Sequence, residues 1–229
     1  MKKSFVYNSY RHHYESIVDV IREMEDLDKE LLETDMESLI AFNHTYLIIT
    51  KAVSSKLGQN YFHNDERMQA LDINFAGYYF DALKNYIDGQ LTPPAWEILF
   101  DACKKDHLMQ SIYMGMGVNA HVNNDLSQSL RDVINDASYK EDFDKVNTTI
   151  HYSTPEVIKY LQEKNAVVNT VKNISLPIYS FALSIIIQKW RENAWNDSRK
   201  LIAHTISEEK IENQAYTMAK KLVFFKRIL

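Results

Sequence analysis

Histidine, asparagine and aspartate side chains that could do chemistry gather in one short stretch, "GMGVNAHVNND", at residues 115–125. His121 and Asp125 are four residues apart, so on a helix their side chains lie one turn apart on the same side. An imidazole and a carboxylate in this arrangement can bind a divalent metal ion. We therefore take His121 and Asp125 as candidate metal ligands.

A helical projection places three further polar residues on faces that are otherwise apolar. Asn119 falls at the centre of the apolar stripe of its predicted helix, where an unpaired amide would cost about 1–3 kcal/mol. Asp72 lies on the apolar stripe that begins at Met68, and Arg191 lies on the stripe of Ile187. A buried charge needs a partner. We therefore expect Asp72 and Arg191 to face each other, with Asn119 bonded to one of them or to a backbone group.

Two interpretations of this set are open. In the structural interpretation, the side chains form a buried polar network that holds the helices in register. In the functional interpretation, they line one cavity inside a helical bundle, where ligand sites are often built. A metal ion would then activate water, with Asp72 or Asp125 as ligand or base and Arg191 stabilising an anionic transition state. The candidate catalytic residues are Asp72, Asn119 and Arg191.

Other chemistries have weaker support in the residue types. Carboxylate-bridged iron needs two E-x-x-H units, which the sequence lacks, and a haem needs an axial histidine such as His44 or His121. The acidic segments 25–28 and 124–132 depart from the Mg²⁺ motifs of terpene synthases. Aromatic side chains, among them Tyr79, could instead wall the apolar pocket of a binding protein without catalytic activity.

Composition and charge favour a soluble helical protein. Of the 229 residues, 45% are hydrophobic and 25% are charged, whereas only 5 are glycine and 4 are proline, too few turn residues for a β-rich fold. The formal net charge of −5 and the absence of basic runs argue against a nucleic-acid partner. The single Cys103 excludes an intramolecular disulfide. With neither a signal peptide nor a membrane span indicated, we expect a cytoplasmic protein.

Apolar periodicity and capping signals predict helices along most of the chain. The polar segment 136–153 is expected to be part loop and part short helix, and Thr154 with Pro155 to start a new helix. Gly115 and Gly117 are expected to permit the close approach of another helix. The predicted helices cover residues 10–33, 34–56, 65–86, 92–104, 108–135, 154–173, 177–204 and 208–221. The sequence thus predicts one all-α domain, residues 1–229, built as a bundle of about eight or nine helices.

The stretch "GMGVNAHVNNDL", residues 115–126, resembles the G-M-x-N-A-H-I-N-x-D-L motif of a bacterial all-helical family catalogued as a domain of unknown function. It has one extra residue if Gly115 is the first glycine, and it has Val118 in place of methionine if Gly117 is. Further matching pieces cover most of residues 40–202. They are "FNHTYLIITKAV", "LDINFAGYYFDAL", "PPAWEILF", "FDKVNTTI" and "RENAWNDSRKL".

The resemblance implies a single helical domain and selects residues without naming a reaction. The residues that it selects are Asp72, Asn119, His121, Asp125, Asn147, Arg191 and Trp195. Our hypothesis is an enzyme of the metal-assisted hydrolase type for a small molecule, with a divalent metal on His121 and Asp125. The alternative is a non-catalytic helical binding or interaction protein whose buried polar network is structural. The oligomeric state does not follow from the sequence.

Overall fold

The computed structural model describes residues 2–134, 136–164 and 176–224, and within these ranges the regular secondary structure is helical, apart from one isolated β-bridge between Lys3 and Thr34. In this part of the chain there are nine α-helices, or eight if the contiguous α5 and α6 are counted as one. They are α1 (Ile17–Leu31), α2 (Ile40–Ser54), α3 (Asp65–Ile87), α4 (Pro94–Lys105), α5 (Gln110–Ala120), α6 (Leu126–Val133), α7 (Lys140–Lys164), α8 (Leu176–Ile202) and α9 (Glu208–Phe224). The predicted all-α bundle is confirmed.

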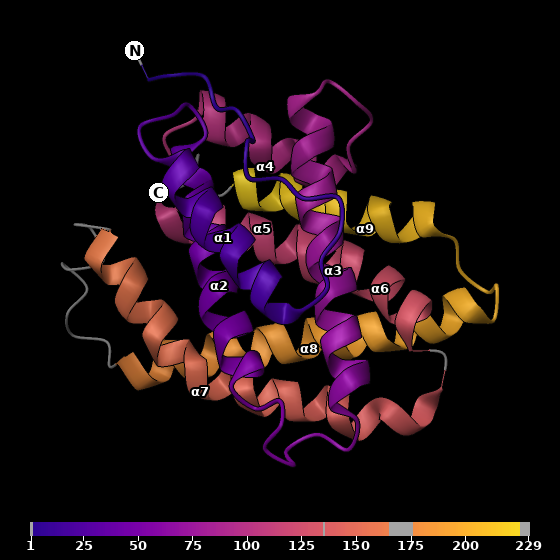
Figure 1. Cartoon of the computed structure of the whole chain (residues 1–229). Helices are drawn as coiled ribbons and strands as arrows, with labels where there is room; N and C mark the ends of the chain where they lie inside the picture. Colours follow the sequence, from indigo (N-terminus) through magenta and orange to yellow (C-terminus); the bar gives the residue numbers. More distant parts are fainter. Residues whose placement is uncertain (1, 135, 165–175, 225–229) are drawn as a thin grey trace.

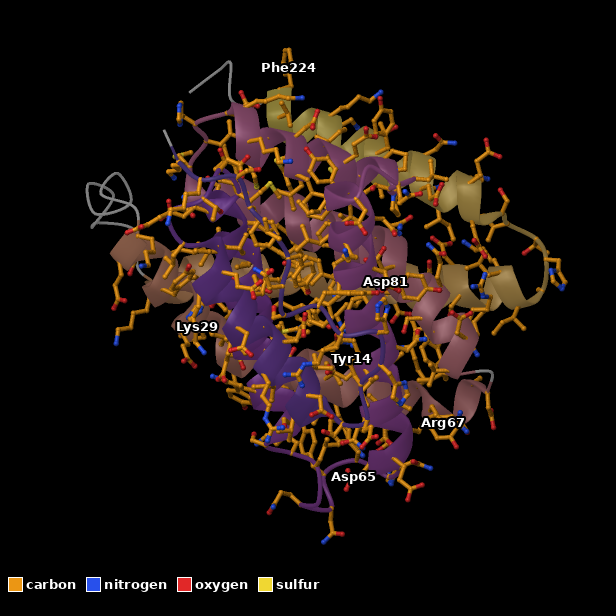
Figure 2. The ribbon with its side chains drawn as sticks, turned by 45° about the horizontal axis from the view of Figure 1, so that its top comes forward. Tyr14, Lys29, Asp65, Arg67, Asp81 and Phe224 are labelled. Atoms are coloured by element: carbon orange, nitrogen blue, oxygen red, sulfur yellow. The ribbon has the colours of Figure 1, made fainter. Side chains whose placement is uncertain are left out.

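The first helix starts later than predicted because a capping box fixes its start. The Ser16 hydroxyl accepts a hydrogen bond from the Asp19 amide, and the Asp19 carboxylate accepts one from the Ser16 amide. These two bonds satisfy amides that would otherwise lack partners at the helix start. The residues before Ser16 are not helical but pack across α1 and α3. Tyr14, for example, is buried with its ring 5.4 Å from that of Phe80, and it lies over the middle of the molecule in Figure 2.

Residues 137–139 form a short 3-10 helix, in keeping with the prediction of loop and short helix, but the predicted helix start at Thr154 was wrong, because α7 is one continuous helix from Lys140 with Pro155 inside it. Proline in a helix interior removes a hydrogen bond and costs about 3 kcal/mol. This cost is outweighed because α7 buries an apolar stripe along its whole length. The stripe consists of Phe143, Val146, Ile150, Val157, Ile158 and Leu161. The predicted end of this helix near residue 173 lies outside the described residues.

One glycine brings two helices into close contact. A Cβ atom on Gly117 of α5 would lie 2.3 Å from Cγ of Phe42 on α2, whereas a Cβ on Gly115 would meet no atom within 4 Å. The expectation of close helix approach is therefore confirmed for Gly117 and was wrong for Gly115. The contact sets how closely α5 packs against α2.

The helices surround one continuous core. In Figure 1, α2 and α3 run through the middle of the bundle, α7 and α8 lie across one of its ends, and α4, α5 and α9 lie towards the other. The buried apolar cluster extends from Phe5 in the N-terminal segment to Ala219 in α9. None of the helices in the described ranges combines the length and apolar character needed to cross a membrane.

Candidate functional site

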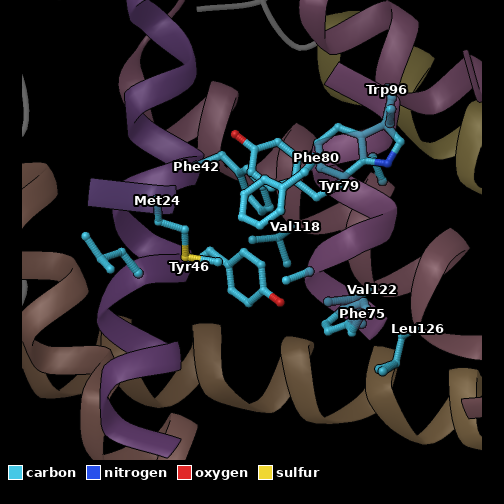
Figure 3. Close-up of a cluster of buried hydrophobic side chains, with 14 of the residues drawn as sticks. Met24, Phe42, Tyr46, Phe75, Tyr79, Phe80, Trp96, Val118, Val122 and Leu126 are labelled. Carbon is cyan, nitrogen blue, oxygen red and sulfur yellow. The ribbon is translucent and has the colours of Figure 1, made fainter. Parts of the chain in front are cut away.

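A small cavity lies at the centre of the bundle, where α2, α3, α7, α8 and the junction of α5 with α6 meet. Its volume is about 70 Å³. One buried water molecule needs roughly 10–15 Å³ of such space, so the cavity has room for a molecule of a few non-hydrogen atoms. The wall is mostly apolar, and its ionisable groups are Tyr46, Asp72, His121 and Arg191. Figure 3 shows the Tyr46 side chain extending from α2 into the space in front of Phe75.

The histidine of the cavity lies on a break in helical geometry. Residues His121–Asp125, the segment η2, form a π-helix between α5 and α6, and the Leu126 amide donates to the His121 carbonyl five residues earlier. In place of the single α-helix predicted over 108–135, the structure has α5, the π-helical segment and α6 in direct succession over residues 110–133, with the wider π-helical turn at the most polar residues. Such π-insertions often occur at functional sites, since they redirect the side chains around them.

The His121 imidazole is held rigidly by its neighbours. Its ring is stacked on that of Phe75, with 3.5 Å between centroids and 7° between planes, and the centroid of the Tyr46 ring is 4.5 Å away in an edge-to-face arrangement. On one side of the ring, Nδ1 is 3.0 Å from Oδ2 of Asp125. On the other side, Nε2 is buried and has no hydrogen-bond partner among the described residues.

The surroundings of Asp125 determine which nitrogen of His121 carries the proton. Trp96 donates its indole N–H to Oδ2 of Asp125 at 2.9 Å, and the Asn124 amide donates to Oδ1 at 2.8 Å. The Asp125 carboxylate can only accept hydrogen bonds, so Nδ1 of His121 must carry the proton and donate it. In the neutral imidazole, Nε2 then carries the lone pair. Burial lowers the pKa of His121, against the opposing effect of Asp125, and this favours the neutral imidazole.

Asp72 contributes a carboxyl group that can change its charge near neutral pH. Its Oδ2 atom is buried without a hydrogen-bond partner, although the residue as a whole is partly exposed. Burial raises the pKa of Asp72 to about 7, and the nearby positive charge of Arg191 lowers it in part. The carboxyl can therefore donate or accept a proton at neutral pH.

Arg191 faces the same cavity but does not pair directly with Asp72. Its Nε donates to Oδ1 of Asn147 at 2.7 Å, its Nη2 donates to the Phe143 carbonyl at 3.3 Å, and the guanidinium carbon is 4.3 Å from the Phe143 ring centroid. Burial lowers the pKa of Arg191 to about 10, so the group stays charged at neutral pH. Asp72 and Arg191 thus line one cavity, as expected, but among the described residues no ion pair joins them, because neutral acceptors on α7 already hold the guanidinium.

Asn119 lies outside the cavity and ties two helices together. Its side-chain amide donates to the Ala215 carbonyl of α9 at 2.9 Å, and its oxygen accepts from Asn123 at 2.9 Å. This confirms the expected bond to a backbone group. The fully buried position fits the structural interpretation for this one residue of the predicted set.

His121 and Asp125, the predicted metal ligands, form a hydrogen-bonded pair in the structure. Nδ1 of His121 and both oxygens of Asp125 already have partners within the protein. Within the described ranges, no group of three or more His, Cys, Asp or Glu side chains is placed to hold a metal ion. A divalent metal on His121 and Asp125 stays a prediction.

Three aromatic residues of the site were not predicted as functional. Trp96 donates a hydrogen bond to Asp125, and the ring of Phe75 stacks on that of His121. Tyr46 lines the cavity with a buried hydroxyl. Aromatic residues at helical spacing are typical of an ordinary core, so their pattern did not single them out. The sequence did contain a signal for Trp96. A buried indole N–H needs a hydrogen-bond acceptor, and the Asp125 carboxylate in the stretch 115–126 is such an acceptor.

Comparisons with known proteins place the chain in a family without assigning it an activity. The model of a family described as "Family of unknown function (DUF5995)" matches residues 17–227, a range that includes every residue of the site. No curated protein and no solved structure matches the chain.

Proposed function

This chain belongs to the family of unknown function DUF5995, and we propose from the geometry of its cavity that it is an enzyme for a small acidic molecule. His121 acts as the general base, with Asp125 orienting it and Asp72 as the general acid. The observation that carries the proposal is the unpartnered Nε2 of His121, which lies on a cavity-lining imidazole whose other nitrogen is bound to a fixed carboxylate.

A purely structural histidine would be expected to satisfy both ring nitrogens. A buried polar atom without a hydrogen bond costs about 1–3 kcal/mol. Three residues of the cavity wall carry such an atom on a group suited to proton transfer, namely Nε2 of His121, Oδ2 of Asp72 and the hydroxyl of Tyr46. Unpaired groups that converge on one space are satisfied when a ligand or water enters it, and this supports a binding role.

The charge of the wall indicates the class of ligand. Arg191 is the cationic side chain of the wall, and Asp72 is partly protonated at neutral pH because its pKa is about 7. A carboxylate or another small anion would be stabilised by the guanidinium in these apolar surroundings. The small cavity limits such a ligand to a few non-hydrogen atoms.

Binding and proton transfer can be tested separately. Acetate, added as a minimal carboxylate, should shift the NMR signal of the His121 ring proton. Pyruvate incubated with the protein in D₂O should exchange its methyl protons for deuterium faster than in buffer. His121→Gln should slow this exchange by about 10²–10⁴-fold, the usual contribution of a general base. The exposed His13 supplies a matched control, and His13→Ala should leave the rate unchanged.

Three outcomes would contradict the proposal. Equal exchange by the His121→Gln variant and the parent protein would exclude His121 as the base. Should His121→Gln fail to fold, Asp72→Asn provides the second test, because loss of the acid should also slow exchange. Acetate binding without exchange of any pyruvate proton would favour the non-catalytic alternative. Absence of both effects would remove the small-acid site.

The metal hypothesis is tested on the same preparations by elemental analysis of the untagged protein. About one divalent ion per chain, lost in both His121→Ala and Asp125→Ala, would replace the acid–base mechanism by metal-assisted hydrolysis. The hydrogen bonds that occupy Asp125 argue for the metal-free mechanism. On that mechanism, the metal content of the parent protein and of both variants should be equal.

A further inference from the structure

A second hollow lies on the surface between α8, α9 and the π-helical segment η2, and we call it the α8–α9 groove. Its volume is about 350 Å³, within the range of small-molecule sites. It is separate from the central cavity, with which it shares no lining residue. In Figure 1, α8 and α9 diverge from the connection that joins them. The groove is lined by Asn123, Trp190, Asn193, Ala194, Asp197, Gln214 and Met218.

Amide side chains from three elements converge on the groove. Asn193 of α8 and Gln214 of α9 make no side-chain hydrogen bond with any other described residue. Asn123 of η2 donates its amide to Asn119 at 2.9 Å and keeps its carbonyl oxygen for another partner. Each amide offers both donor and acceptor atoms without a net charge. Such groups can pair with hydroxyl groups, which also both donate and accept.

The charges at the groove disfavour an anionic ligand. Asp197 is the charged residue of the lining, and its carboxylate is paired with Lys200 at 2.7 Å. Neither lysine nor arginine is among the described residues that line the groove. A phosphate or carboxylate ligand would therefore meet a carboxylate and find no cation in the wall.

The apolar part of the groove is an indole. Trp190 is partly exposed and packs against the core on one side, and Met218 and Ala194 continue the apolar surface. A partly exposed indole amid neutral amides suits a molecule with one face of C–H groups and a rim of hydroxyls. Sugars and cyclic polyols have this character.

We propose that the α8–α9 groove binds a neutral polyhydroxylated molecule such as a sugar, with Trp190 against its C–H face. The amides of Asn123, Asn193 and Gln214 hydrogen-bond to its hydroxyls. The pairing of Asn123 with Asn119 joins this groove to a buried amide of α5. The proposal is independent of the chemistry proposed for His121, because it concerns different residues and requires no turnover.

The three tryptophans provide a direct measurement. Trp96 and Trp195 are buried, with exposures of 0% and 5%, so quenching of the protein fluorescence by acrylamide reports mainly on Trp190. Glucose, galactose, N-acetylglucosamine and myo-inositol serve as probes, each at up to about 100 mM because millimolar dissociation constants correspond to only about 4 kcal/mol. At least one probe should protect Trp190 from acrylamide. Trp190→Phe should abolish the fluorescence response and retain binding in saturation-transfer NMR.

Amide variants then test the hydrogen bonds. Asn193→Ala and Gln214→Ala should each weaken binding of the active probe about fivefold, as expected for one lost hydrogen bond. Gln59→Ala, at an exposed glutamine between α2 and α3, serves as the matched control and should have no effect. The proposal is overturned if no probe protects Trp190 or if both amide variants bind as the parent does. Tighter binding of glucose 6-phosphate than of glucose would also overturn it, by showing an anion site.

Discussion

At the scale of single residues, the central cavity combines four ionisable groups whose charges are set by burial, and Tyr46, whose pKa is raised by burial, is neutral. Burial lowers the pKa of His121 and raises that of Asp72, so both favour their neutral forms, whereas Arg191 stays charged. The groups are held by different partners, Asp125 for the imidazole and Asn147 for the guanidinium. Asp72 has an unpartnered buried oxygen and a pKa of about 7, so its charge should affect stability most directly.

Asp72→Asn should make the protein more stable at alkaline pH. The folded-state pKa of Asp72 is raised to about 7, so its stabilising contribution is complete below the unfolded pKa near 4 and is lost as pH rises through 7. Asparagine stays neutral and avoids this loss. We expect urea unfolding at pH 8 to show a gain of about 1–4 kcal/mol in the free energy of unfolding over the parent.

The same comparison at pH 4 should show a much smaller difference, because Asp72 is then protonated in the folded protein. Asp88→Asn provides the control, since Asp88 is exposed and paired only with Lys84, and surface pairs contribute little. A parent protein that gained stability relative to Asp72→Asn between pH 4 and pH 8 would disprove the raised pKa.

At the scale of elements, the junction of α5 with α6 determines how the site is built. The π-helical segment directs His121 into the cavity, while Asn123 in the same segment lines the α8–α9 groove. Immediately before it, Gly117 allows Phe42 of α2 to pack against the α5 backbone. The position of His121 therefore depends on the close packing of α5 on α2.

Gly117→Ala should destabilise the protein and Gly115→Ala should stabilise it. A Cβ at position 117 would overlap the Phe42 ring, and such overpacking costs about 1–3 kcal/mol. A Cβ at position 115 meets no atom within 4 Å, so alanine there should contribute about 0.5–1 kcal/mol through helix propensity. Urea unfolding of the two variants measures both effects. Changes of the same sign would contradict the close α2–α5 contact.

At the scale of the whole molecule, all the helices contribute to one buried cluster. Trp96 of α4 stacks on Tyr79, and Trp195 of α8 packs against Phe143, yet both indoles belong to the same apolar core. A contiguous core favours unfolding as one cooperative unit. This is the physical basis for expecting residues 1–229 to form one domain.

The two buried indoles should report the same unfolding transition. Trp96 is observed alone in a Trp190→Phe/Trp195→Phe variant, and Trp195 alone in a Trp96→Phe/Trp190→Phe variant. Within each variant, the urea midpoint from fluorescence should coincide with the midpoint from far-UV circular dichroism. Separate midpoints would show that the α4 and α8 regions unfold independently and that the chain contains more than one domain.

The sequence by itself determined the helical class, most helix boundaries and the polar residues that lie on apolar faces. These properties follow from local periodicity and capping, which depend on residues a few positions apart. For this reason Asp72, Asn119, His121 and Arg191 could be singled out before any contact was known. The break predicted at Pro155 failed because packing along α7, which local signals do not contain, outweighed the cost of the proline.

Only the tertiary structure decided which polar residues share a cavity and which partners they have. Asp72, His121 and Arg191 line one space, Asn119 faces α9, and Arg191 bonds to α7 rather than to Asp72. These hydrogen bonds join residues up to 96 positions apart, as between Asn119 and Ala215, so they depend on how whole helices cross. The tertiary structure also decided the π-helical segment. Its polar side chains find hydrogen-bond partners on other helices, as Asp125 does with Trp96.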